Sequence, residues 1–200
     1  MELLLATRNA HKAREFRELL GDDFNVRDLS ALPEITVPEE TGGTFAENAR
    51  LKAIAVSQDR QSFVLADDSG LEVDALGGRP GVFSARYAGE GATDTENVEK
   101  LLREMKRAGA LKPSQRQARF RCVLALARAA KILGLFSGVV EGTIVDLARG
   151  SAGFGYDPAF LPNGYAKTFG ELPARVKNQI SHRAKAVQVF RAAMKSGALS

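Results

Sequence analysis

The sequence has a single cysteine, Cys122, among its 200 residues. One thiol excludes a framework of intrachain disulfides and a zinc site made of several cysteines, and it fits a reducing compartment. No apolar run approaches the length of about 18 residues that a membrane-spanning helix needs, and no charged-then-apolar signal peptide opens the chain. We therefore expect a cytoplasmic protein with no membrane partner.

Internal repeats, low-complexity tracts and a Walker-type phosphate loop are lacking as well. The stretch from Thr7 to Lys12 has neither the glycines nor the Gly-Lys-Ser/Thr ending of that loop, which excludes an ordinary P-loop NTPase. Hydrophobic residues make up 44% of the chain, enough for the core of one domain, which we assign to residues 1–200. The formal charge of +4 is compatible with either a nucleic acid or a small polyanion as ligand.

The order of apolar segments and turn signals in the first half of the chain predicts an α/β fold. A strand is expected over 2–6, followed by a helix that carries Phe16, and a capping box predicts a second helix over 44–58. A buried strand over 63–66 is expected to end at Asp67. Acidic residues at a strand end favour a cleft at that point.

Longer elements are predicted in the second half. The stretch 95–108 has the spacing of an amphipathic helix, and 119–127 and 133–145 have the composition of two long strands. Two long strands that follow each other predict an antiparallel hairpin within a mixed sheet.

Cationic side chains cluster where two helices are expected to begin. One group is Thr7-Arg8-Asn9-Ala10-His11-Lys12, and the other is Ser181-His182-Arg183, with Lys177 shortly before it. A helix N-terminus already carries partial positive charge and unpaired N–H donors, so further cations there favour the binding of an anion such as phosphate. Taken singly, Lys12 and His182 are also compatible with ordinary surface side chains.

Acidic residues form a counterpart to these cations, at Glu39, Glu40, Glu47, Asp67 and Asp68. Oxygen ligands of this kind suit Mg²⁺, which shares its coordination shell with water and substrate phosphates. Acids and cations together therefore indicate a metal-bound polyphosphate. Separately, the same acids are compatible with a turn, a capping box and a solvated charge pair.

Aromatic residues alternate with glycines in Gly153-Phe154-Gly155-Tyr156-Asp157-Pro158. Glycine lets the backbone approach a ligand closely, and Phe154 can stack on a planar base while N–H groups meet the edge of that base. The alternative is a tight turn with Phe154 in the core.

The chain contains seven motifs in the order in which they occur in the inosine/xanthosine triphosphate pyrophosphatase family. Because of these motifs, it resembles that family from residue 3 to about 190. The motifs are Thr7 to Lys12, Glu39-Glu40-Thr41-Gly42, Phe45-Ala46-Glu47-Asn48-Ala49 with Lys52, Ala66-Asp67-Asp68-Ser69-Gly70-Leu71, Gly81 to Tyr87, Gly153 to Pro158 and Ile180-Ser181-His182-Arg183. The chain departs from many members of the family at Arg8, where they have glycine.

The resemblance implies a homodimer of two-lobed α/β subunits, each with a long mixed sheet flanked by helices and a substrate cleft between the lobes. It also implies hydrolysis of non-canonical purine nucleoside triphosphates (ITP, dITP and XTP) to the monophosphate and pyrophosphate, with Mg²⁺ as cofactor. Nucleic acid is not an expected partner.

Roles for single residues follow from the positions that match the family's motifs. The resemblance implies that Asp68 is the catalytic proton acceptor and that Glu39 and Asp68 bind Mg²⁺. It implies that the substrate-binding residues are Thr7, Arg8, Asn9, Ala10, His11, Lys12 and Lys52 for the triphosphate, Ser69 beside Asp68, and Phe154, Gly155, Tyr156, Asp157, Lys177, His182 and Arg183 for the base and its sugar.

A noncatalytic module that binds nucleotides or nucleic acid is the competing hypothesis. Such a module would spread Lys and Arg over one face and keep carboxylates away from its basic groove. Here acids and cations recur together at loop ends, which favours the enzyme.

Overall fold

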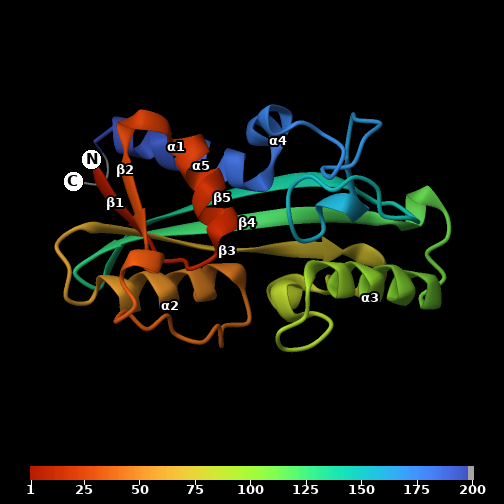
Figure 1. Ribbon diagram of the computed structural model, residues 1–200, viewed down its shortest axis with the longest axis horizontal. Coiled ribbons are helices and arrows are strands. Elements are labelled where there is room, and N and C mark those ends of the chain that lie inside the picture. Colours follow the sequence, from red (N-terminus) through yellow and green to blue (C-terminus); the bar gives the residue numbers. More distant parts are fainter. Residues whose placement is uncertain (198–200) are drawn as a thin grey trace. The chain divides into compact units, whose positions relative to one another are not determined.

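The computed structural model describes residues 1–197. Within them, six strands form one sheet in the order β2-β1-β3-β4-β5-β6 (Figure 1). The strand β1 (Glu2–Leu5) pairs in parallel with β2 (Asn25–Asp28) and with β3 (Phe63–Val73). The sheet also contains an antiparallel pair, so it is mixed, and the predicted α/β class is confirmed.

The chain divides into two compact units, which are described separately. The first comprises Met1–Asp68, Cys122–Gly138 and residues 183–197, and the second comprises Ser69–Arg121 and Val139–His182. Each unit has its own cluster of buried apolar side chains. No helix in the described part of the chain has the length and apolar character needed to cross a membrane.

Three helices cover the part of the sheet that belongs to the first unit. In Figure 1, α1 (Ala10–Leu20) and α5 (His182–Lys195) lie on one face of this part and α2 (Phe45–Ser57) lies on the other. Phe16 and Leu20 of α1 are buried in the first unit's core, as their helical spacing requires. The predicted capping box at the start of α2 is present, because Thr44 and Glu47 cap each other's backbone N–H groups.

The strand β3 is longer than predicted. It does not end at Asp67 but continues through Asp67 and Asp68 to Val73, so the expectation of acids at a strand end is wrong. The strand continues because cations neutralise both buried carboxylates and because Leu71 and Val73 beyond them are buried apolar residues. The two acids therefore lie in the interior of the strand.

The second unit contains α3 (Asp94–Arg107), α4 (Ala174–Ile180) and the short strand β6 (Phe160–Pro162). A second capping box starts α3, with Thr93 and Glu96 as its two members. The core of this unit is rich in aromatic rings that contact one another, and they belong to Phe120, Phe160 and Phe169. The predicted helix over 95–108 is confirmed to within one residue at each end.

The two long predicted strands are also confirmed, as β4 (Gln117–Arg128) and β5 (Lys131–Ile144). They are neighbours in the sheet, and only Ala129 and Ala130 connect them, which makes the pair an antiparallel hairpin. Both alanines have positive φ, at 49° and 60°, as the connection of a tight hairpin requires. Their N–H groups donate to Arg60 and Ser57, just after and at the end of α2.

Candidate functional site

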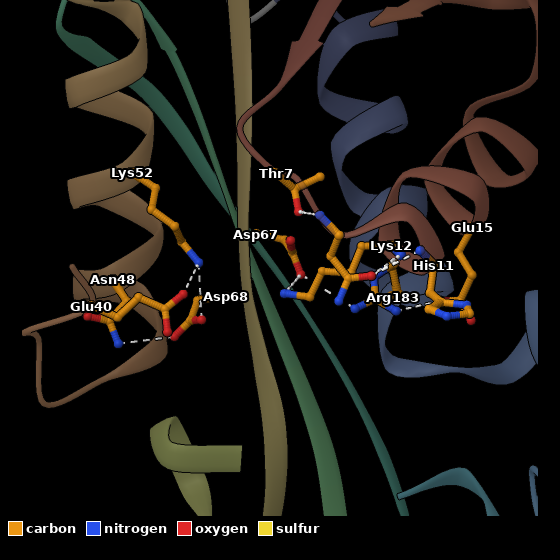
Figure 2. Close-up of polar contacts among 11 residues, drawn as sticks. Thr7, His11, Lys12, Glu15, Glu40, Asn48, Lys52, Asp67, Asp68 and Arg183 are labelled. Carbon is orange, nitrogen blue, oxygen red and sulfur yellow. Dashed lines mark hydrogen bonds and ion pairs between the residues drawn. The ribbon is translucent and has the colours of Figure 1, made fainter. Parts of the chain in front are cut away.

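Asp68 lies on the face of β3 that is covered by α2, and it is the centre of a buried charge cluster (Figure 2). Its Oδ1 accepts a hydrogen bond from Lys52 Nζ at 3.2 Å, and its Oδ2 accepts one from Asn48 Nδ2 at 3.2 Å. Lys52 Nζ also donates to Glu40 Oε1 at 2.7 Å. Asn48 and Lys52 reach the same carboxylate because residues four apart lie on one face of a helix. We call these four residues the Asp68 cluster.

Burial and neighbouring charges have opposing effects on the pKa values of Asp68 and Lys52. Burial raises the pKa of Asp68 to about 6, and the nearby charge of Glu40 adds to the rise while Lys52 opposes it. Burial alone would lower the pKa of Lys52, but the negative charges of Asp67, Asp68 and Glu40 raise it instead. The cluster therefore pairs a charged ammonium with a carboxylate that is more basic than an ordinary aspartate.

Asp67 lies on the opposite face of β3, towards α1 and α5. It forms ion pairs with Lys12 Nζ at 3.0 Å and with Arg183 Nη2 at 3.4 Å. Arg183 also pairs with Glu15, and its guanidinium lies over the ring of Phe16 at 5.4 Å. We call Lys12, Glu15, Asp67 and Arg183 the Asp67 cluster.

Asp67 and Arg183 are the buried members of the Asp67 cluster and carry opposite charges. Burial would raise the pKa of Asp67, but Lys12 and Arg183 hold it well below its ordinary value. Burial would lower the pKa of Arg183, whereas Glu15 and Asp67 raise it. The side chain of Arg183 is only 1% exposed, so in this structure it is held inside the protein.

The loop from Thr7 to Lys12 forms the start of α1. Asn9 is the N-cap, and its side-chain oxygen accepts hydrogen bonds from the N–H groups of His11 and Lys12 at 2.9 and 3.1 Å. Thr7 Oγ1 accepts from the N–H of Asn9 at 3.1 Å. Ala10, the first residue of the helix, is exposed. The capped loop holds Lys12 at one fixed position beside β3.

The side chain of Arg8 contacts backbone carbonyl oxygens, which its position in the cationic loop did not predict. Its guanidinium donates to the carbonyl oxygens of Leu29 at 2.9 Å and of Ile35 at 2.7 Å, and also to Leu32 and Pro33. A guanidinium committed to backbone carbonyls holds the 29–35 segment against α1. Arg8 therefore has a structural role in this structure, and its expected contact with the triphosphate stays a prediction.

The carboxylates that can hold a metal ion are those of Asp68 and Glu40. Both contact Lys52, whereas Glu39 is exposed and its backbone carbonyl accepts a hydrogen bond from the N–H of Thr41. Among residues 1–197, no group of three or more His, Cys, Asp or Glu side chains could hold a metal ion. Two carboxylates nevertheless fit Mg²⁺, since this ion normally takes its other ligands from water and phosphate.

The second unit contributes the loop from Gly153 to Asp157, which we call the aromatic loop. Asp157 is buried, accepts from the N–H of Phe154 at 2.9 Å, and pairs with Lys177 Nζ at 2.5 Å. A side chain at Gly153 would collide with Asp157, because an added Cβ would lie 1.9 Å from Oδ2 and φ is +76°. Lys177 Nζ lies 5.0 Å from the centre of the half-buried Phe154 ring, a cation–π contact.

Two further contacts hold the aromatic loop. The N–H of Gly155 donates to Asp94 Oδ2 at 2.6 Å, and the hydroxyl of Tyr156 donates to the Ser84 carbonyl at 2.8 Å. The N–H groups of Phe154 and Gly155 are thus used within the protein. The half-buried Phe154 ring is accordingly the part of this region best suited to contact a base.

The other predicted substrate-binding residues lie as follows. His182 is buried in the second unit and stacks on Phe120, with ring centroids 4.8 Å apart. Ser69 follows Asp68 in β3 and is half-buried.

Three residues that belong to these clusters or contact the aromatic loop were not predicted from the sequence. Glu15 lies one helical turn after Lys12, and Asn48 lies one turn before Lys52, so helical spacing from a known lysine could have found both. Asp94 is 61 residues from its partner Gly155, and no sequence signal connects the two.

The fold is thus that of a mixed α/β protein that carries a buried aspartate paired with cations on each face of its sheet. The chain belongs to the Ham1 family, whose model matches residues 3–193, and this confirms the resemblance found in the sequence. It is 49% identical to the dITP/XTP pyrophosphatase of Geobacillus kaustophilus, over 93% of this chain and 90% of that protein. It is 47% identical to the dITP/XTP pyrophosphatase of Bacillus subtilis, over 94% of this chain and 93% of that protein.

The fold agrees with that of a solved relative. The structure of the Ham1 protein of Staphylococcus aureus superimposes with a TM-score of 0.86 at 40% sequence identity, and the match covers 98% of this chain and 100% of that one.

Proposed function

We propose that this protein is a nucleoside triphosphate pyrophosphatase that hydrolyses dITP, XTP and ITP to the monophosphate and pyrophosphate. The names of its relatives support this activity. The single structural observation that carries the proposal is Asp68, a buried carboxylate with raised pKa that is held between Lys52 and Asn48. Such a group suits proton transfer near neutral pH.

Asp68 acts as the proton acceptor in this proposal. Hydrolysis forms a bond between the oxygen of water and phosphorus, breaks the anhydride between the α and β phosphates, and releases a proton from the water. A carboxylate with a pKa of about 6 is mostly ionised at pH 7, yet it binds a proton more strongly than an ordinary aspartate. Asn48 fixes the orientation of this carboxylate through its hydrogen bond to Oδ2.

Lys12 and Lys52 bind the triphosphate. Each lysine has an ammonium group near β3, one on each face of the strand, and phosphate oxygens are strong partners for such groups. The same charges stabilise the negative charge that develops on the departing pyrophosphate. Asp67 and Asn9 contribute indirectly, because they hold Lys12 and the start of α1 in place.

A divalent cation, proposed as Mg²⁺, would be held by Asp68 together with a carboxylate from the Glu39-Glu40 pair. When bound, it would neutralise charge on the phosphate oxygens. The contact of Glu40 with Lys52 supports Glu40 as the second ligand in preference to Glu39.

The base is bound by the aromatic loop, Lys177 and His182 in this proposal. The Phe154 ring offers a stacking surface, and the Lys177 ammonium, which pairs with Asp157, would turn one N–H towards the 6-oxo group of a purine. The 6-amino group of adenine cannot accept, and an unpaired buried donor costs about 1–3 kcal/mol, or roughly 10- to 100-fold in efficiency. This supports discrimination against ATP.

We further propose a homodimer that acts in the cytoplasm. The family resemblance supports the dimer, and a substrate drawn from the nucleotide pool supports the location. Light scattering measures the mass of the protein in solution. A dimer would have about twice the mass of the 21.5 kDa chain.

The decisive experiment measures pyrophosphate release from dITP, XTP, ATP and GTP, with and without Mg²⁺. We expect dITP and XTP to be cleaved at least about tenfold more efficiently than ATP and GTP, and expect no release without the metal. The Asp68→Asn variant is the control for contaminating phosphatases. Equal efficiency with ATP would show that the protein is a general nucleotide pyrophosphatase.

A further inference from the structure

The ammonium group of Lys52 lies between the two carboxylates that are proposed to bind the metal. Its Nζ is 2.7 Å from Glu40 Oε1 and 3.2 Å from Asp68 Oδ1. The Lys52 side chain is 6% exposed and that of Asp68 is 5% exposed, so bulk water screens this arrangement poorly. The lysine therefore offsets part of the negative charge of the two carboxylates.

A divalent cation needs the same oxygen atoms. Mg²⁺ binds carboxylate oxygens at about 2.0–2.1 Å, and an ammonium group that contacts those oxygens would lie close to the ion and repel it. Full occupation of the carboxylates by the metal therefore requires Lys52 Nζ to move away or to find another partner. The flexible four-carbon stem of lysine permits such a movement.

We propose that Lys52 and the divalent cation compete for Glu40 and Asp68, so that the metal binds tightly only when a triphosphate takes over the ammonium group. This inference rests on the proposed function, because it uses the metal site and the triphosphate assigned there. Phosphate oxygens form charge-assisted hydrogen bonds with Lys52 and so replace the carboxylates as its partners. Metal and nucleotide then bind cooperatively, and each raises the affinity for the other by the same factor.

The competition has a functional consequence. Without nucleotide, the carboxylate of Asp68 is neutralised by Lys52 and not by a metal ion. A nucleoside or a monophosphate offers Lys52 fewer phosphate oxygens, so these ligands assemble the metal site less well than a triphosphate does. The site is thus complete only when the intended substrate class is present.

The test measures Mn²⁺ binding at pH 8 to the nucleotide-free protein, by the loss of the electron paramagnetic resonance signal of free Mn²⁺. Lys52→Met removes the charge and keeps most of the length of the side chain. We expect this variant to bind Mn²⁺ at least about tenfold more tightly than the wild type, because its carboxylates have lost the competing cation. Adding Glu40→Gln to Lys52→Met should abolish most of this gain.

Lys12→Met is the matched control. Lys12 pairs with Asp67 on the other face of β3, so its removal should change Mn²⁺ affinity by much less than the removal of Lys52. Circular dichroism and thermal unfolding would show that each variant is folded before its affinity is compared.

A second measurement needs no variant. It uses a non-hydrolysable dITP analogue with a methylene group between the α and β phosphates. Mn²⁺ should bind to the complex of wild-type protein and analogue more tightly than it binds to the nucleotide-free protein or to the analogue alone in solution. If Lys52→Met binds Mn²⁺ no more tightly than the wild type, and the analogue gives no such coupling, the competition does not exist. Failure of the proposed function would look different, since the wild type would then release no pyrophosphate from dITP.

Discussion

The consecutive residues Asp67 and Asp68 point to opposite faces of β3 and belong to two different charge clusters (Figure 2). Asp67 pairs with Lys12 and Arg183, whereas Asp68 contacts Lys52 and Asn48. This separation follows from the alternation of side chains along a strand. It means that two adjacent acids cannot serve one metal ion together, and that they should respond differently to the same substitution.

Asp68→Asn should abolish activity and leave the fold intact. We expect turnover of dITP to fall by about 10²-fold or more, because the amide can neither accept the proton from water nor hold a metal ion as the carboxylate does. Steady-state kinetics at saturating Mg²⁺ checks this, and near-normal turnover would contradict the role given to Asp68.

Asp67→Asn should chiefly destabilise the protein. The change removes the negative charge between Lys12 and Arg183, and breaking a buried ion pair typically costs about 3–5 kcal/mol. Urea unfolding at pH 7 measures the loss. An unfolding free energy within about 1 kcal/mol of the wild type would show that the Asp67 cluster is not a stabilising element.

The pH dependence of stability should reveal the raised pKa of Asp68. This carboxyl has a pKa of about 6 in the folded metal-free protein against 3.8 for an unperturbed aspartate. Well below pH 3.8 both states are protonated and the shift has no effect, but as pH rises from about 3.8 through 6 the unfolded state ionises first and the folded state loses up to about 3 kcal/mol. Asp68→Asn cannot ionise, so its unfolding free energy relative to wild type should increase between pH 4 and pH 8. Chemical unfolding in the presence of a chelator tests this, and a difference that does not vary with pH would contradict it.

The sequence predicted the local elements well and the surroundings of the charged residues less well. Apolar spacing and capping residues predicted α1, α2, α3 and the β4–β5 hairpin, since these signals are local. The end of β3 was misplaced because two aspartates normally disfavour a strand interior. Their cationic partners come from α1, α2 and α5, and a local reading of the sequence does not include those neighbours.

The motifs also identified the charged residues without showing which of them contact each other. Arg8 was grouped with Lys12 because it lies in the same loop, yet its guanidinium points to the carbonyls of the 29–35 segment. The resemblance implied Glu39 as the metal ligand, although of the two neighbouring acids Glu40 is the one that contacts Lys52 within the part of the chain that the structure describes. Pairings of this kind depend on the tertiary fold.

Arg8→Ala and Lys12→Ala should therefore differ. Arg8→Ala should lower the unfolding free energy by about 1–3 kcal/mol, because four carbonyls lose a charged donor, and should change the binding of nucleotide little. Lys12→Ala should weaken binding of the triphosphate more than binding of the free nucleoside. Calorimetric titration with both ligands checks this, and a selective loss of triphosphate binding in Arg8→Ala would return Arg8 to the phosphate site.

Asp94→Ala should loosen the aromatic loop. The hydrogen bond from the Gly155 N–H to Asp94 would be lost, and a single hydrogen bond to a charged group contributes about 1.5–3 kcal/mol. We expect KM for dITP to rise by roughly tenfold while kcat stays near the wild-type value, because Asp94 contacts the aromatic loop that is proposed to bind the base. Asp94→Asn keeps an acceptor oxygen and should recover most of the affinity. A fall in kcat without a rise in KM would argue against this role.

The hairpin between β4 and β5 offers a way to make the protein more tolerant of mutation. Ala129 and Ala130 both occupy the left-handed region, which costs an L-residue about 1–2 kcal/mol, whereas Asn-Gly adopts it readily. Replacing the pair by Asn-Gly should raise the unfolding free energy and keep the backbone donors to Ser57 and Arg60. The stabilised background would then carry destabilising substitutions such as Asp67→Asn without unfolding, so that their effect on chemistry could be read separately from their effect on folding.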